Sequence, residues 1–82
     1  MLYNIYVLRS LKNGKRYIGS TEKDPKERLR EHNRGSNRWT RYNKPFKLVY
    51  VESFSSRTEA RKRENFLKSG QGRKWLDEQN QE

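Results

Sequence analysis

A tight turn near the N-terminus constrains the fold of this chain most strongly. Asn13 and Gly14 lie between two stretches rich in aromatic and β-branched residues, 2–9 (LYNIYVLR) and 16–20 (RYIGS). An Asn-Gly pair in this setting is a strong hairpin signal, because both residues accept the positive φ angles of a two-residue turn. The first twenty residues therefore predict two paired antiparallel strands.

The pairing register decides which side chains share a face of this hairpin. With the Asn-Gly pair at the centre of the turn, Tyr6 opposes Thr21. Because side chains alternate along a strand, Tyr6, Tyr17 and Gly19 then share one face, and Gly19 leaves a bare patch between the two phenols. The other face carries the apolar side chains that we expect to face the core: Tyr3, Ile5, Val7 and Ile18.

A helix with a well-marked start follows the second strand. Asp24 is the expected N-cap, Pro25 suits the first helical position, and Glu27 can complete a capping box. Arg28 and His32 are four residues apart, so they lie on one face of this helix. A strand that leads directly into a helix displaying Arg and His together is the arrangement of an active site rather than of a folding device.

The rest of the chain completes a single domain over residues 1–82. Further segments follow in order: a basic loop over 33–44, a third strand over 46–54, a helix over 57–68, a break over 69–72 and a last helical turn over 73–77. On the third strand, Phe46, Leu48 and Tyr50 are expected on one face. These elements predict an α+β fold, a small three-stranded antiparallel sheet with flanking helices.

A carboxylate occupies an unusual place on the helix over 57–68. Glu64 is four residues after Ala60 and three before Leu67, so it lies on or beside the buried stripe of that helix. Carboxylates are rarely buried unless they are paired or bind a metal ion. A metal ligand is one interpretation. The alternative is a salt bridge to one of three nearby cations: Arg61, Arg63 or Lys68.

Charge indicates the kind of partner. The chain has 20 Lys and Arg against 10 Asp and Glu, a net charge of +10. A polyanion is the natural partner for such a small basic protein, and nucleic acid is the commonest one; a merely solvated surface is the alternative. Only 29% of residues are hydrophobic, but they are grouped periodically, which argues against disorder.

Cysteine and histidine usage excludes several classes of site. The chain has no Cys and one His, so it has no disulfide framework, thiolate metal site or multi-histidine zinc site. No N-terminal apolar run resembles a signal peptide, and no segment is suited to span a membrane. We therefore expect a cytoplasmic protein that acts without a membrane or a small-molecule cofactor, as a monomer.

The segment 33–44 interleaves aromatic and cationic residues. Trp39 and Tyr42 lie among four basic residues: Arg34, Arg38, Arg41 and Lys44. Such a segment can stack bases and bind phosphates. The alternative is that the two aromatic rings pack onto the sheet and enlarge a small core.

Several of these residues together resemble the GIY-YIG nuclease superfamily. The tripeptides 4–6 (NIY) and 17–19 (YIG) resemble the GIY and YIG motifs that give the superfamily its name. Arg28 and His32 match its helix-borne Arg and His. The segment around Glu64 matches the one that carries its metal-binding Glu. The resemblance covers almost the whole chain, as in small standalone bacterial members of the UPF0213 type.

The chain departs from the family pattern at two points. Asn4 stands where the family has its first Gly, which leaves the packing of that strand open. The family's downstream Asn has no clear match in this sequence.

The resemblance implies a metal-dependent endonuclease that hydrolyses phosphodiester bonds in nucleic acid, with DNA the expected substrate. Glu64 would hold a single Mg²⁺ or Mn²⁺, and Arg28 would bind a phosphate oxygen. Tyr6 would be the general base, its pKa lowered by Arg28 and the metal, while Tyr17 and His32 orient water and phosphate.

Lys15 and Arg16 are expected to contact the backbone of the nucleic acid. Two questions stay open, the kind of nucleic acid and the activity itself. The choice between DNA and RNA is not decided by the sequence. The competing interpretation is a nucleic-acid-binding module without hydrolysis.

Overall fold

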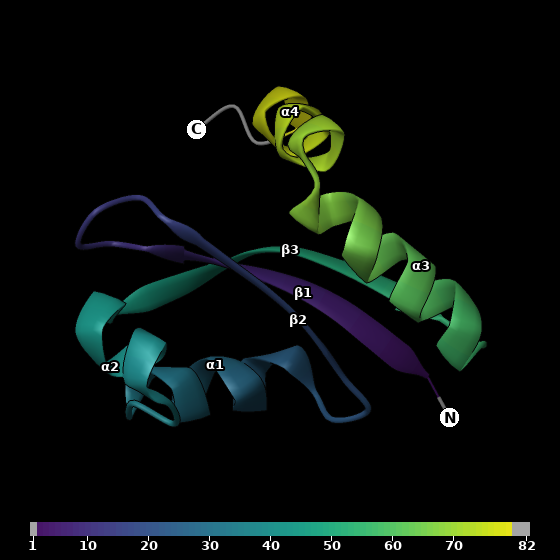
Figure 1. The fold of residues 1–82 in the computed structure, drawn as a ribbon. Coiled ribbons are helices and arrows are strands. Elements are labelled where there is room, and N and C mark those ends of the chain that lie inside the picture. The colour runs from purple at the N-terminus through teal and green to yellow at the C-terminus, as the bar shows by residue number, and fades with distance from the viewer. Residues whose placement is uncertain (1, 80–82) are drawn as a thin grey trace.

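A computed structural model of the chain, which describes residues 2–79, has a three-stranded antiparallel sheet between two pairs of helices (Figure 1). The strands are β1 (Tyr3–Ser10), β2 (Arg16–Thr21) and β3 (Phe46–Phe54), in the order β2-β1-β3. Helices α1 (Pro25–Asn33) and α2 (Arg38–Asn43) lie on one face, and α3 (Arg57–Lys68) and α4 (Gly70–Gln79) lie on the other. The predicted α+β fold is confirmed.

Each face of the sheet has a core of its own. On the α3–α4 face, Ile5 and Val7 of β1 are fully buried against a set of apolar helix residues: Ala60, Leu67 and Leu76. This is the face that the sequence predicted as the core side. On the other face, Tyr6 and Leu8 are buried with Phe46. The central strand is therefore covered on both sides, so the face that carries the tyrosines is an interior surface as well.

The hairpin register differs from the predicted one. Tyr6 opposes Gly19, not Thr21, because the loop spans 11–14 and is closed by a hydrogen bond from the Ser10 N–H to the Lys15 carbonyl (2.8 Å). The pairing is thus displaced by two positions along β2. An even displacement keeps the alternation of side chains, so Tyr6, Tyr17 and Gly19 share a face as predicted.

The third strand has its predicted bounds but contains a bulge. Val7 pairs with Tyr50 whereas Leu8 pairs with Leu48, so Val49 is an extra residue on β3. Tyr50 consequently packs in the α3–α4 core, while Leu48 packs on the other face. The expectation that Phe46, Leu48 and Tyr50 share one face is therefore wrong.

Helix α1 begins where the sequence predicts and ends at Asn33. The Asp24 carboxylate accepts a hydrogen bond from the Lys26 N–H (2.9 Å), and Pro25 opens the helix. Gly35 follows the last turn with a φ of +83°, a conformation that glycine adopts without steric cost. The chain therefore turns sharply after α1.

The predicted basic loop over 33–44 contains the short helix α2. Asn37 caps it: its side chain accepts from the Thr40 N–H (2.8 Å), and the Thr40 hydroxyl accepts from the Asn37 N–H (3.1 Å). Mutual capping of this kind satisfies backbone donors that a six-residue helix would otherwise expose. A helix this short has no hydrophobic period in sequence, so the loop assignment is corrected here.

The break between α3 and α4 is narrower than the predicted 69–72. Helix α4 begins at Gly70, directly after Ser69, and continues to Gln79 instead of ending at Asp77. The Ser69 hydroxyl accepts a hydrogen bond from the Gly72 N–H (3.1 Å), and a Cβ on Gly72 would lie only 2.0 Å from the Phe66 carbonyl oxygen. The two helices therefore approach closely at their junction. Within residues 2–79, no helix has the length and apolarity to cross a membrane.

Candidate active site

Four of the five predicted catalytic side chains meet on the α1 face of the sheet. The Tyr6 hydroxyl lies 3.0 Å from His32 Nε2, and Arg28 Nε donates to the same hydroxyl over a long 3.4 Å. The Tyr17 ring lies 4.6 Å from the imidazole and 6.3 Å from the Tyr6 ring, measured between centroids. We call Tyr6, Tyr17, Arg28 and His32 the tyrosine–histidine cluster.

The shape of β2 makes room for this cluster. A Cβ on Gly19 would lie 2.6 Å from the Tyr6 hydroxyl oxygen and 3.1 Å from a ring carbon of Tyr17. The first separation is too short for a side chain and the second is tight, so glycine is the residue that leaves the Tyr6 phenol in its place. The predicted bare patch between the two phenols is therefore present and filled by the Tyr6 hydroxyl.

Burial dominates the acid–base properties of the cluster. Tyr6 is 1% exposed, and burial raises its pKa above the usual value, while the hydrogen bond and charge of Arg28 act in the opposite direction. The expected lowering by Arg28 is thus present but outweighed. Burial also lowers the pKa of His32, aided by the charge of Arg28, so the neutral imidazole is favoured at neutral pH.

Arg28 is held by a carboxylate of its own helix. Its Nη1 donates to Glu31 Oε1 at 2.6 Å, and Glu31 also pairs with Lys23 at 3.4 Å. Glu31 is three residues after Arg28, a spacing at which helical side chains meet. The sequence therefore contained the signal for this partner, although the site prediction did not include it.

Glu64, the fifth predicted side chain, lies on the other side of the sheet. It is carried by α3, and its carboxylate accepts from Lys68 Nζ (2.9 Å) with 20% of the side chain exposed. It also lines a cavity of about 210 Å³ together with Ser20 and Thr21 of β2. Glu64 is therefore outside the hydrogen-bonded cluster but next to the same edge strand. Of the three salt-bridge partners that the sequence offered, Lys68 is the one observed.

The donor chemistry at Glu64 fits a hard cation. Lys68 binds Oε2, and among the described residues Oε1 accepts no hydrogen bond. Carboxylate oxygen is the donor that Mg²⁺ and Mn²⁺ prefer, with water and phosphate completing the shell. Between residues 2 and 79, no three His, Cys, Asp or Glu side chains are grouped to hold an ion, so Glu64 would be a lone protein carboxylate.

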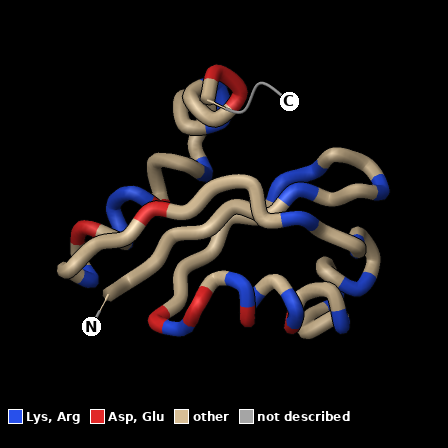
Figure 2. Tube along the Cα trace, turned by 180° about the vertical axis from the view of Figure 1, so that it is seen from behind, with Lys and Arg blue, Asp and Glu red and all other residues tan. Residues whose placement is uncertain are grey.

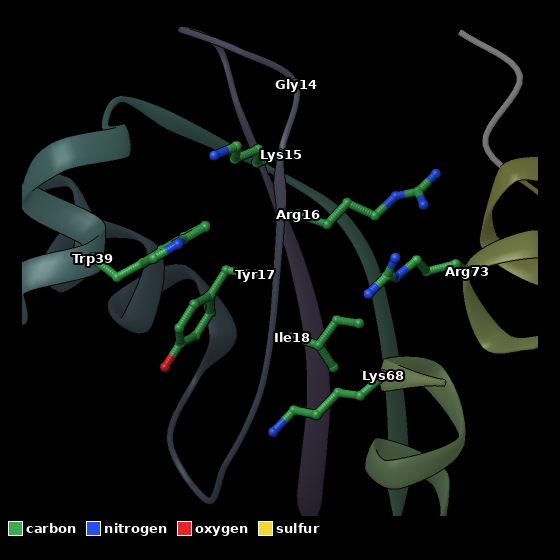
Figure 3. Close-up of a pocket in the computed structure, with 8 residues that line it drawn as sticks. All are labelled: Gly14, Lys15, Arg16, Tyr17, Ile18, Trp39, Lys68 and Arg73. Carbon is green, nitrogen blue, oxygen red and sulfur yellow. The ribbon is translucent and has the colours of Figure 1, made fainter. Parts of the chain in front are cut away.

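A cationic groove runs along the outer edge of β2 (Figure 3). Its volume is about 810 Å³, and side chains from both layers of helices line it. Trp39 and Tyr17 lie on one side of the strand, and Lys68 and Arg73 lie on the other. The remaining lining residues belong to the hairpin: Gly14, Lys15, Arg16 and Ile18. We call this feature the edge groove.

The predicted nucleic-acid contacts are divided between the edge groove and the surface beside it. Lys15, Arg16 and Trp39 line the groove, and Arg16 also forms an ion pair with Asp77 of α4. The other predicted cations are exposed and lie between the end of α1 and the start of β3: Arg34, Arg38, Arg41 and Lys44. Figure 2 shows how Lys and Arg positions are distributed along the chain.

The two aromatic residues of the 33–44 segment have different environments. Trp39 is 37% exposed, and its ring lies between those of Tyr17 (5.6 Å) and Phe46 (5.7 Å). This is the packing alternative that the sequence left open. Tyr42 is 74% exposed, with the Lys12 ammonium 4.6 Å from its ring centroid, so its ring can reach a partner in solution.

Three further residues belong to the site although the sequence did not indicate them. Lys68 and Arg73 line the edge groove, and the Ser36 hydroxyl lies 3.0 Å from His32 Nδ1. Lys68 and Arg73 come from separate helices, so no spacing rule connects them with β2. The position of Ser36 depends on the path that the chain takes after Gly35, which local sequence patterns do not specify.

Two hydrogen bonds accommodate Asn4 at the position where the family has Gly. Its Nδ2 donates to the Lys23 carbonyl (3.1 Å), and its Oδ1 accepts from the Ser53 hydroxyl (2.5 Å). Asn4 therefore ties β1 both to β3 and to the segment that leads into α1. Strand packing is maintained with Asn at this position.

Comparison with known proteins agrees with this geometry. The GIY-YIG catalytic domain matches residues 2–77. A UPF0213 protein of Staphylococcus saprophyticus is 38% identical over 66 residues, covering 79% of this chain and 78% of that protein. A UPF0213 protein of Streptococcus pneumoniae is 42% identical over 65 residues, covering 78% of this chain and 64% of that protein.

A solved structure is similar over nearly the whole fold. The solution NMR structure of a UPF0213 protein from Bacillus halodurans has a TM-score of 0.59 and 31% sequence identity, and the match covers 98% of this chain and 86% of that one. The family match, the two relatives and this solved structure indicate the same family. The chain belongs to the GIY-YIG catalytic domain family, a nuclease superfamily.

Proposed function

We propose that this protein is a metal-dependent endonuclease that hydrolyses phosphodiester bonds in nucleic acid, with DNA as the expected substrate. The observation that carries the proposal is the position of the tyrosine–histidine cluster beside the edge groove, with Tyr17 belonging to both. Tyr17 of β2 is thus next to both the proton-transfer groups, Tyr6 and His32, and the phosphate-binding side chains of the edge groove. Membership in the GIY-YIG family supports the same activity.

The edge groove supplies the contacts to the substrate backbone. Lys15, Arg16, Lys68 and Arg73 can each neutralise a phosphate, and Arg16 would exchange Asp77 for one. The exposed Tyr42 ring offers a surface on which a base can stack. The net charge of +10 favours association with any polyanion.

Arg28 is the group that we assign to the reacting phosphate. Its Nε is directed at the Tyr6 hydroxyl and its Nη1 at Glu31, so the guanidinium lies next to the proton-transfer groups. A guanidinium stays charged throughout the reaction and can bind two phosphoryl oxygens. Glu31 would release part of it when the phosphate binds.

Tyr6 is assigned as the proton acceptor for the attacking water. Because burial raises its pKa, little phenolate exists at neutral pH. We therefore couple two transfers: Tyr6 Oη accepts a proton from water as its own proton moves to His32 Nε2. The water becomes the attacking hydroxide, and His32 later returns the proton to solvent. Tyr17, which lines the groove, would orient the water and the phosphate.

Glu64 would hold the divalent ion, Mg²⁺ or Mn²⁺. A bound ion would supply Lewis-acid stabilisation of the phosphoryl oxygens and the leaving group. Because the ion would replace the Lys68 ammonium as the partner of Glu64, Lys68 could turn towards the substrate backbone. Lys68 already lines the edge groove.

A specific observation also favours a second function, nucleic-acid binding without hydrolysis. Glu64 is paired with Lys68, and Tyr6 is buried with a raised pKa. Both features suit a structural role as well as a chemical one. The groove and the positive charge serve a binding module equally.

Incubation with labelled nucleic acids distinguishes the two functions. The substrates are branched, nicked and linear DNA, and RNA, each with Mg²⁺, Mn²⁺ or EDTA. An endonuclease produces internal cuts that depend on the metal and disappear both with EDTA and in the Arg28→Ala variant. Stable binding with no cut in any substrate would support the binding module instead.

A further inference from the structure

We propose that Ser36 is a positioning residue that stabilises the His32 tautomer with the proton on Nδ1, by accepting that proton while Nε2 accepts the Tyr6 hydroxyl proton. Only the catalytic consequence rests on the proposed function. The tautomer itself is a property of the folded chain, and it can be measured without any substrate.

Both nitrogens of the His32 ring have one protein partner each. Nε2 lies 3.0 Å from the Tyr6 hydroxyl, and Nδ1 lies 3.0 Å from the Ser36 hydroxyl. His32 is fully buried at 0% exposure. In a neutral imidazole one nitrogen donates and the other accepts, so the two partners together decide which nitrogen carries the proton.

Counting donors at the Tyr6 hydroxyl selects between the two tautomers. Arg28 Nε can only donate, so Tyr6 Oη is an acceptor towards Arg28. The phenolic proton then needs an acceptor of its own, because Tyr6 is buried. Among the described residues, His32 Nε2 is the acceptor within hydrogen-bond distance. Nε2 is therefore unprotonated, and Nδ1–H donates to Ser36.

The opposite tautomer leaves a buried donor without a partner. If Nε2 carried the proton, both His32 and Arg28 would donate to Tyr6 Oη, and the phenolic proton would have no acceptor in the cluster. An unsatisfied buried donor is costly. Ser36, by contrast, is exposed, so its own hydroxyl proton can go to water when Oγ accepts from His32.

Backbone geometry holds Ser36 in this place. The chain leaves α1 through Gly35, whose positive φ of +83° turns it back, and the Gly35 N–H donates to the His32 carbonyl (2.9 Å). Ser36 is thereby brought beside the ring that Tyr17 packs on from the sheet side. Burial and the charge of Arg28 lower the pKa of His32, which keeps the imidazole neutral and able to accept.

Nitrogen-15 NMR of the labelled full chain tests the tautomer directly. His32 is the single histidine of the sequence, so the long-range proton–nitrogen spectrum contains one imidazole. At neutral pH we expect the Nδ1–H tautomer in the unmodified protein and in Ser36→Thr, which keeps the hydroxyl. Ser36→Ala should shift the population towards Nε2–H. Ser55→Ala, at an exposed serine in the turn before α3, is the matched control and should change nothing.

Two NMR results would overturn the proposal. One is an Nε2–H tautomer in the unmodified protein, and the other is an unchanged tautomer in folded Ser36→Ala. A backbone amide spectrum of each variant establishes that it is folded, so that loss of structure is not mistaken for a shift in tautomer.

A cleavage measurement separates this proposal from the proposed function. For an active enzyme, Ser36→Ala should lower kcat about 10²-fold, as loss of ordered proton transfer does, with KM little changed and with recovery in Ser36→Thr. If the tautomer responds as expected but no protein cleaves any substrate, the proposed function fails and the positioning role stands. Unchanged kcat in a variant whose tautomer has shifted would overturn the catalytic consequence alone.

Discussion

Tyr6 holds its position because the residue across from it has no side chain. The cluster at residue scale is a set of close fits: Gly19 under the Tyr6 hydroxyl, His32 and Arg28 at hydrogen-bond distance, and Tyr17 against the imidazole. Two of these fits are steric or ring contacts, and two are hydrogen bonds to the buried Tyr6 hydroxyl. Small changes in shape or charge here are therefore expected to have large effects.

Replacing Gly19 by alanine tests the steric fit. The new methyl would lie 2.6 Å from the Tyr6 hydroxyl oxygen, so the buried phenol must move and its bond to His32 must break. We expect Gly19→Ala to cost about 1–3 kcal/mol of unfolding free energy, measured by denaturant unfolding. Ser20→Ala, at the next and exposed position, is the control, with a change within about 0.5 kcal/mol. Equal stability of Gly19→Ala and the control would disprove the close fit.

Histidine titration makes stability depend on pH in a definite direction. The pKa of His32 is lower in the folded chain than in the unfolded chain, where it is about 6.5. Below that pH the unfolded state binds more protons, so stability falls as pH decreases. Thermal unfolding between pH 7.5 and 5 should show this decrease, and it should be smaller in His32→Gln. Parallel curves for the two proteins would contradict the burial of a neutral imidazole.

The junction of α3 and α4 determines where two groove cations lie. Lys68 ends α3 and Arg73 is in the first turns of α4, so both depend on how closely the helices approach at Ser69. The close approach is possible because Gly72 faces the backbone of Phe66 and Leu67. At the scale of elements, the edge groove is thus a product of helix geometry rather than of the sheet alone.

Two glycines of α4 give a matched pair of substitutions. A Cβ on Gly72 would lie 2.0 Å from a backbone oxygen, whereas one on Gly70 meets nothing within 4 Å. We expect Gly72→Ala to lose about 1–3 kcal/mol or more of unfolding free energy. Gly70→Ala should be neutral or stabilising by up to about 1 kcal/mol, because alanine favours the helix. Denaturant unfolding measures both, and similar values for the two variants would refute the close approach.

Elements with strong local signals were predictable, and their relative placement was less so. The bounds of β3 and α3 were predicted as 46–54 and 57–68, and the structure has them at these residues. The bulge at Val49 could not be foreseen, because apolar residues occupy both phases of that strand. The hairpin register depends on a loop closed by Ser10, which an Asn-Gly signal does not reveal.

The candidate site was predictable where local spacing along a helix or strand determines it. Helical spacing brought Arg28 and His32 together, and strand parity brought Tyr6 and Tyr17 together, as the structure shows. Long-range contributions were not visible in sequence. Arg73 reaches the groove only through the packing of α4.

At the scale of the whole molecule, the edge groove connects the two helical layers across β2. Cations reach it from the hairpin, α3 and α4, and further cations lie on the α1–α2 side. A polyanion lying along this edge would contact both layers at once. Binding should therefore weaken steeply as salt concentration rises, because each neutralised phosphate releases counterions.

Neighbouring cations of α4 test whether the groove is the contact. Arg73 lines it, whereas Lys74 is exposed and outside it. Arg73→Gln should weaken DNA binding and reduce the slope of log affinity against log salt by about one. Lys74→Gln removes the same charge and should change the slope much less. Fluorescence anisotropy at several salt concentrations measures both, and equal effects would show that net charge, not the groove, determines binding.

The central claim is hydrolysis that depends on Glu64. Metal-dependent cleavage by two variants, one at each residue of the Glu64–Lys68 ion pair, tests this claim most directly. Glu64→Gln and Lys68→Gln both break the pair between these residues. We predict that folded Glu64→Gln keeps its affinity for DNA but loses cleavage, by at least several kcal/mol in the barrier. Lys68→Gln should bind more weakly yet still cleave when DNA is saturated with protein. Cleavage by folded Glu64→Gln at the unmodified rate would contradict the metal site at Glu64 and the metal-dependent mechanism proposed from it.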